Sequence, residues 1–92
     1  MFVKLHRIRN NNNSYYLTEV VVNVSHVSFM SENREYKMAL IEGKMDIKLN
    51  TNAEFTDIYI NRTGHSEKFT VVGSVEFIES KINKTTKKLL RD

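Results

Sequence analysis

The chain has 92 residues, enough for one domain with little room for a second. It contains no cysteine, which excludes a disulfide framework, a thiolate nucleophile and a cysteine-based zinc site. The formal net charge of +3 at pH 7 permits a polyanionic partner without requiring one. No apolar run approaches the roughly 20 residues that span a bilayer, so we expect a cytoplasmic protein without a membrane partner.

The amino-acid usage points to the source of the chain. Proline and tryptophan are absent, whereas asparagine, lysine and isoleucine together supply 26 of the 92 residues. Proline codons are rich in G and C, and the codons of the other three are rich in A and T. The composition therefore indicates an A/T-rich genome, such as that of a low-GC bacterium or one of its phages, and explains part of the lysine excess.

The N-terminal part reads as a hairpin. Residues 2–9 place Val3 and Leu5 on one face, as a half-buried strand requires. Residues 10–14 are a polar, asparagine-rich loop, because asparagine tolerates left-handed backbone and bonds its own main chain. Residues 15–17 then begin a second strand.

Residues 18–30 are rich in β-branched side chains, which favours strand over helix. The pattern leaves open whether one strand runs through this segment or a short turn at residues 18–21 separates two. Residues 27–30 are expected to be a strand in either case. Residues 31–35 combine charges with turn formers and are expected to be a loop.

A second hairpin is predicted from residues 36–42 and 45–49 about Gly43, because apolar and charged residues alternate in the latter run. Residues 50–54 are the next loop. A third hairpin follows, in which residues 55–60 and 68–72 flank a turn at residues 62–65.

A helix is predicted over about residues 74–90, where the apolar period changes from 2 to 3.6. Ser74 suits the N-cap, and Glu76 places a negative charge in the first turn, where it complements the helix dipole. The apolar stripe consists of Val75, Ile78, Ile82 and Leu89.

Together these elements predict an α+β fold. A single domain over residues 1–92 would hold an antiparallel sheet of five to seven short strands, over about residues 2–72, with one C-terminal amphipathic helix packed on it. Edge strands of small sheets must be covered or charged, and pairing with another subunit is one solution. We therefore expect a homo-oligomer.

The sequence does not indicate catalysis. His6, His26 and His65 are far apart in the chain and lack the short spacing of a metal site. Ser25 and His26 are adjacent, and neighbours on a strand point to opposite faces. The glycines are isolated, so no phosphate-binding loop exists. We expect no enzyme activity, no metal and no cofactor.

Two sets of residues are candidates for binding. Arg7, Arg9 and Arg62 can pair bidentately with phosphate, and His65 in the turn beside Arg62 joins them as a candidate ligand-binding residue. The second set is a basic stripe on the predicted helix that could follow a nucleic-acid backbone. The alternative for this stripe is an ordinary solvated helix face. It consists of Lys81, Lys84, Lys88 and Arg91.

Two segments carry a resemblance. The run from Tyr16 to Val24, and the run Phe69-Thr70-Val71-Val72-Gly73-Ser74-Val75-Glu76-Phe77-Ile78, resemble the flagellar FlbD-like family. The same layout is similar to phage-encoded sponge proteins of the Thoeris anti-defence type. Residues 31–54 would be an insertion relative to the flagellar pattern, and Thr18-Glu19 stands where that pattern has an Asn-Pro turn.

The sponge resemblance implies a β-rich oligomer with a helix that sequesters a nucleotide-type signal, and it carries over one ligand-binding position, Arg62. The expected function is thus that of a small, non-enzymatic phage or mobile-element protein that blunts a host process in the bacterial cytoplasm. It would sequester a signal nucleotide or occlude a host protein. The alternative is a small nucleic-acid-binding regulator that uses the basic helix.

Overall fold

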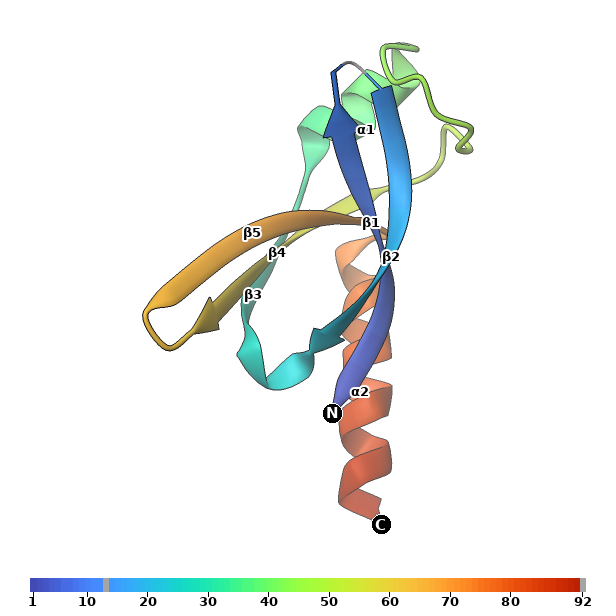
Figure 1. Ribbon diagram of the computed structural model, residues 1–92. Helices are drawn as coiled ribbons and strands as arrows, with labels where there is room; N and C mark the ends of the chain where they lie inside the picture. The colour runs from blue at the N-terminus through green and yellow to red at the C-terminus, as the bar shows by residue number, and fades with distance from the viewer. Residues whose placement is uncertain (13, 92) are drawn as a thin grey trace.

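The computed structural model describes residues 1–12 and 14–91, with side chains described as far as residue 84. This part of the chain is an α+β structure with five strands, one short 3-10 helix (η1) and two α-helices, where the sequence predicts one (Figure 1). The elements in chain order are β1 (Phe2–Asn11), β2 (Ser14–Asn23), η1 (Val24–His26), β3 (Val27–Glu32), α1 (Arg34–Ile41), β4 (Phe55–Arg62), β5 (His65–Val72) and α2 (Val75–Arg91).

The five strands form one antiparallel sheet in the order β2-β1-β5-β4-β3. β1 pairs with β2 along its length, and β4 pairs in the same way with β5. The β1–β2 hairpin and the β4–β5 hairpin are paired with each other at one position, where Arg7 of β1 lies opposite Val71 of β5. Away from this point the hairpins spread apart, as Figure 1 shows, and η1 carries the chain from β2 to β3.

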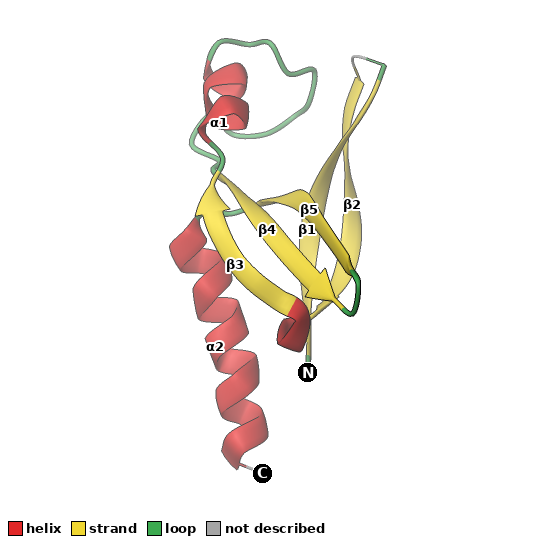
Figure 2. Ribbon diagram, turned by 90° about the vertical axis from the view of Figure 1, so that its left-hand side faces the viewer, coloured by secondary structure: helices red, strands yellow, loops and turns green. Residues whose placement is uncertain are grey.

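The larger core lies where α2 meets the sheet. Ile78 of α2 is fully buried there. α2 packs across the sheet against β1, β3 and β4, and its later turns extend past the end of the sheet, as Figure 2 shows. Among the described side chains, Ile78 and the half-buried Ile82 pack α2 on the strands. The buried members of this core are Val3, Leu5, Val22, Ile58, Ile60, Val71 and Ile78.

Residues 36–42 belong largely to α1, so the predicted second hairpin is wrong. Asn33 caps this helix: its Oδ1 accepts a hydrogen bond from the backbone N–H of Tyr36 at 3.0 Å. The same side chain donates from Nδ2 to Oδ1 of Asp57 in β4, also at 3.0 Å. The cap and a run of good helix formers outweigh the apolar character that suggested a strand.

Residues 45–49 are loop, not strand. Their alternation nevertheless reflects burial: Met45 is buried, and Ile47 and Leu49 are half-buried in a second core that includes Phe55. The N–H groups of Ile47 and Leu49 donate to the carbonyl groups two residues earlier, at 3.0 and 3.1 Å. The segment therefore satisfies part of its backbone locally while its apolar side chains cover a core.

Between β2 and β3 the structure has a turn, but not at the expected place. β2 continues through residues 18–21, and the turn is η1. The Asn23 side chain accepts a hydrogen bond from the backbone N–H of Ser25 at 3.0 Å, and the N–H of Val24 donates to the carbonyl of Met1 at 3.1 Å. The first bond caps η1, and the second ties η1 to the N-terminus.

Both hairpins turn more tightly than expected. β1 and β2 stay paired up to Asn11 opposite Ser14. β4 and β5 stay paired up to Arg62 opposite His65, which leaves a two-residue turn with Gly64 at a φ of +69°. Glycine adopts this left-handed conformation without the steric cost of a Cβ.

Tyr36 links α1 to the rest of the second core. Its ring meets Tyr15 and Phe55 edge-on, with centroids 6.1 and 5.8 Å away. Burial, followed by the nearby Tyr15 and Asp57, raises the pKa of the Tyr36 phenol above its ordinary value of 10.0.

This shift predicts a loss of stability at alkaline pH. The folded state holds the phenolic proton more tightly than the unfolded state, so its contribution is full below about pH 10 and is lost as pH rises through the folded pKa. We expect the Tyr36→Phe variant to lose less stability over this range than the wild type. Urea unfolding at a series of pH values measures the difference, and parallel curves for the two proteins would contradict the prediction.

Candidate functional site

A hollow of about 390 Å³ opens between the β1–β2 hairpin and the β4–β5 hairpin, where the two spread apart. Valines of β2 form an apolar wall. The charged and aromatic side chains along the hollow come from β1, η1, β4 and β5. They are Phe2, Arg7, His26, Arg62, Glu67 and Phe69.

Arg7 is the residue that singles out this hollow. The central guanidinium carbon of Arg7 lies 5.2 Å from the centroid of the Phe69 ring, a cation–π contact. The Nε atom of Arg7 is buried and has no hydrogen-bond partner among the described residues. Buried polar groups are nearly always hydrogen-bonded in folded proteins. Arg7 therefore holds an unused donor beside an open space.

A second unpartnered polar atom lies next to Arg7. The Thr18 Oγ1 is also buried without a hydrogen-bond partner in the described structure. Thr18 of β2 is directly opposite Arg7 of β1 in the strand register. Thr18 is not among the residues that line the hollow, so of these two atoms only the Arg7 Nε belongs to a side chain of the hollow.

Arg62 of β4 and Glu67 of β5 lie diagonally on neighbouring strands, both on the β4–β5 side of the hollow. Nη2 of Arg62 is 3.8 Å from Oε1 of Glu67, a long ion pair between side chains that are both about half exposed. Such a pair is weak and easily exchanged for another partner. The two arginines and one glutamate leave an excess of positive charge, which suits an anion.

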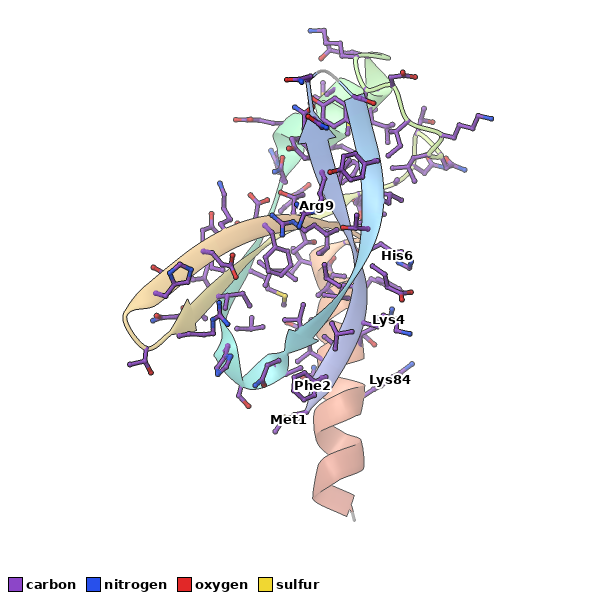
Figure 3. The ribbon with its side chains drawn as sticks, viewed as in Figure 1. Met1, Phe2, Lys4, His6, Arg9 and Lys84 are labelled. Atoms are coloured by element: carbon purple, nitrogen blue, oxygen red, sulfur yellow. The ribbon has the colours of Figure 1, made fainter. Side chains whose placement is uncertain are left out.

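The structure divides the four predicted ligand-binding residues. Arg7 and Arg62, distant in the chain, line the same hollow. Arg9 is exposed further along β1, where Figure 3 labels it, and is not part of the lining. His65 is exposed at the β4–β5 turn, opposite Arg62 in the register but outside the hollow.

The predicted basic stripe is described only in part, since the side chains of Lys88 and Arg91 lie outside the described residues. Figure 3 shows Lys4, His6 and Lys84 projecting from one side of the molecule. Lys81 joins that side, where its Nζ donates to the carbonyl of Lys4 at 3.3 Å. Nζ of Lys4 in turn lies 3.7 Å from Oε1 of Glu19, so this basic surface is partly neutralised.

Four of the charged and aromatic residues of the hollow were not predicted as site residues: Phe2, His26, Glu67 and Phe69. His26 stands alone in the sequence, and η1 alone brings it to the hollow. Glu67 and Phe69 alternate along β5 on the face shared with Val71, the partner of Arg7. That alternation was visible in the sequence, but the pairing of β5 with β1 was not.

Comparison of the chain with protein families, curated proteins and solved structures found no match. Within residues 1–12 and 14–91, no three His, Asp or Glu side chains come together as a metal site would require. In the same part of the chain, no helix is long and apolar enough to cross a membrane.

Proposed function

We propose that this protein is a non-enzymatic binding protein that captures a small anionic ligand with a planar ring, a signal nucleotide, in the hollow between its two hairpins. The observation that carries the proposal is the buried, unpartnered Nε of Arg7. A guanidinium pairs well with phosphate, and hydrogen bonds to charged groups contribute about 1.5–3 kcal/mol.

The walls of the hollow suit the rest of a nucleotide. Its volume of about 390 Å³ lies in the range of small-molecule sites, which extends from about 300 to 1,000 Å³. Apolar valines and the Phe69 ring offer surface for a base, while Arg62 can exchange Glu67 for a phosphate. The mixture of apolar wall and convergent cations favours a nucleotide over a bare inorganic anion.

By sequestering such a ligand, the protein would blunt a host process in the cytoplasm of a bacterium, as a phage or mobile-element product. The alternative within this class involves no nucleotide: the surface of a homo-oligomer would occlude a host protein. The A/T-rich composition and the sponge resemblance of residues 16–24 and 69–78 support a phage origin. The hollow supports sequestration over occlusion.

A nucleic-acid-binding regulator is the second candidate. Lys4, His6, Lys81 and Lys84 share one side of the molecule, and the Phe77 ring lies 5.2 Å from Nζ of Lys81. Aromatic and basic groups together can stack bases and contact phosphates. This surface is less developed than the hollow because Lys4 already pairs with Glu19.

Native mass spectrometry of the protein purified from bacterial cells, with and without Arg7→Met, tests the proposal. We expect the wild type to carry a bound mass on the order of a few hundred daltons, and the variant to lose it, with affinity reduced about 10- to 100-fold. Because the substitution removes a buried donor that has no hydrogen-bond partner, the melting temperature of the protein without ligand should stay the same or rise.

Arg9→Met is the matched control, since it removes an equal charge from the same strand outside the hollow. It should retain the bound mass. A wild-type protein without any bound mass, or equal retention by both variants, would contradict sequestration in this hollow. Loss of the bound mass in Lys84→Glu alone would favour the nucleic-acid surface.

A further inference from the structure

β2 is an unusually open edge strand. It is the terminal strand of the sheet, and β1 is the only element with which it makes an extensive contact in the described structure. Its pairing with β1 runs without interruption from Phe2 opposite Asn23 to Asn11 opposite Ser14. One edge of this ten-residue strand therefore presents backbone N–H and C=O groups that no other strand takes up.

The residues of β2 do not protect this edge. Natural edge strands are usually short, bulged, or interrupted by lysine or proline. Between Ser14 and Asn23 there is no proline, lysine or arginine, and Glu19 is the one charged residue. Three large apolar side chains along the strand are exposed. They are Tyr16 at 42%, Leu17 at 37% and Val21 at 63%.

By contrast, the other terminal strand is protected. The register of β3 with β4 shifts between Val27 and Phe29, which marks an irregularity in the ladder. β3 is also short, with six residues against ten in β2. Of the two ends of the sheet, β2 is thus the one that lacks the devices that prevent edge pairing.

We propose that a second copy of this chain occupies the free edge of β2, with the two β2 strands antiparallel about a two-fold axis. Such an interface is self-complementary, so both copies use the same edge. Pairing takes up the open backbone groups and continues the sheet across the dimer. The inference stands apart from the identity of any ligand.

Charge excludes one register between the two β2 strands, and side-chain pairing favours another. Side chains alternate between the two faces of a strand. The faces of the two β2 strands are therefore continuous only where a residue and its opposite residue in the partner both have odd numbers or both have even numbers. An axis at Glu19 would set two carboxylates against each other, which is unfavourable. An axis at Thr18 instead places Leu17 opposite the partner's Glu19. Tyr15 and Tyr16 then oppose the partner's Val21 and Val20, and aromatic side chains pair well with β-branched ones.

This register brings the partner to the hollow. Val20, Val21, Val22 and Asn23 all border the hollow, so its mouth reaches the free edge of β2. Tyr16 lies on the same face of β2 as Val20 and Val22, by strand alternation. The partner's Tyr16, opposite Val20, would add a further aromatic ring to those of Phe2 and Phe69.

A pair of charge variants at one position tests the interface. Leu17→Glu sets a new carboxylate against the partner's Glu19 twice in the dimer, whereas Leu17→Lys sets an ammonium group there. Both lose the same apolar side chain. We expect the wild type to dimerise reversibly with concentration, and the dissociation constants of the two variants to differ by about tenfold, the Lys variant associating more tightly.

Sedimentation velocity over a wide range of protein concentrations measures these constants, and melting curves of dilute samples check that each variant folds. Phe29→Lys is the control, because Phe29 is an exposed apolar residue of β3, at the other end of the sheet from β2. A wild-type protein that remains monomeric at every concentration would overturn the proposal. So would a dimer that both Leu17 variants leave unchanged.

Discussion

Truncating Ile78 to alanine will lower the free energy of unfolding by about 2–5 kcal/mol and loosen α2 from the sheet. Ile78 is fully buried, and it is the α2 residue in the larger core beside Leu5, Ile58 and Val71. Since the later turns of α2 extend past the strands, the helix depends on this anchor (Figure 1). An alanine there leaves a cavity and removes dispersion contacts.

Urea unfolding followed by the helical signal in circular dichroism measures this effect. Phe77→Ala is the matched control, because Phe77 is the adjacent aromatic residue and is 52% exposed. We expect the control to cost less than about 1 kcal/mol. If the two variants lose equal stability, α2 is not held by its buried stripe.

The elements with local signals were the predictable ones. Ser74 does cap α2, with Oγ accepting a hydrogen bond from the backbone N–H of Phe77 at 3.1 Å. Gly73 at the preceding junction leaves room for the helix: a Cβ there would lie 2.9 Å from the Phe77 ring. A cap, a glycine and an apolar stripe are all legible in one stretch of sequence.

α1 was missed although a local signal was present. Asn33 followed by Glu35 is a helix start, with a side-chain cap and an acidic residue in the first turn. The apolar alternation over residues 45–49 suggested a strand that needed a partner, and residues 36–42 were assigned to it. Alternation records which side chains are buried, and a loop that covers a core can show it as well as a strand.

The hollow illustrates what a single sequence cannot supply. Arginine was recognised as the residue type for an anion, and two of the three named arginines line the hollow. Their convergence depends on Val71 of β5 meeting Arg7 of β1, a pairing between distant strands. Phe69 and Glu67 follow from the same pairing. Residue chemistry is local, whereas a site is a property of the topology.

Asn33 offers the second large effect, because one side chain serves two elements. It caps α1 and also donates to Asp57 of β4, a residue that is 8% exposed. Asp57 Oδ1 also accepts from the Thr70 hydroxyl at 2.6 Å. Asn33→Ala removes the cap and one of the donors to a buried carboxylate, which together should cost about 2–4 kcal/mol in the free energy of unfolding.

Asn33→Ser separates the two roles. Serine is a good N-cap, but its hydroxyl is too short to keep the bond to Asp57 while it caps, so this variant should lose only the second contribution. In an Asp57→Asn background, which removes the buried charge, Asn33→Ser should cost less than in the wild type. Urea unfolding of the four proteins closes this double-mutant cycle. A coupling energy of zero would show that α1 is held by its own cap and by the second core, without help from the Asp57 carboxylate.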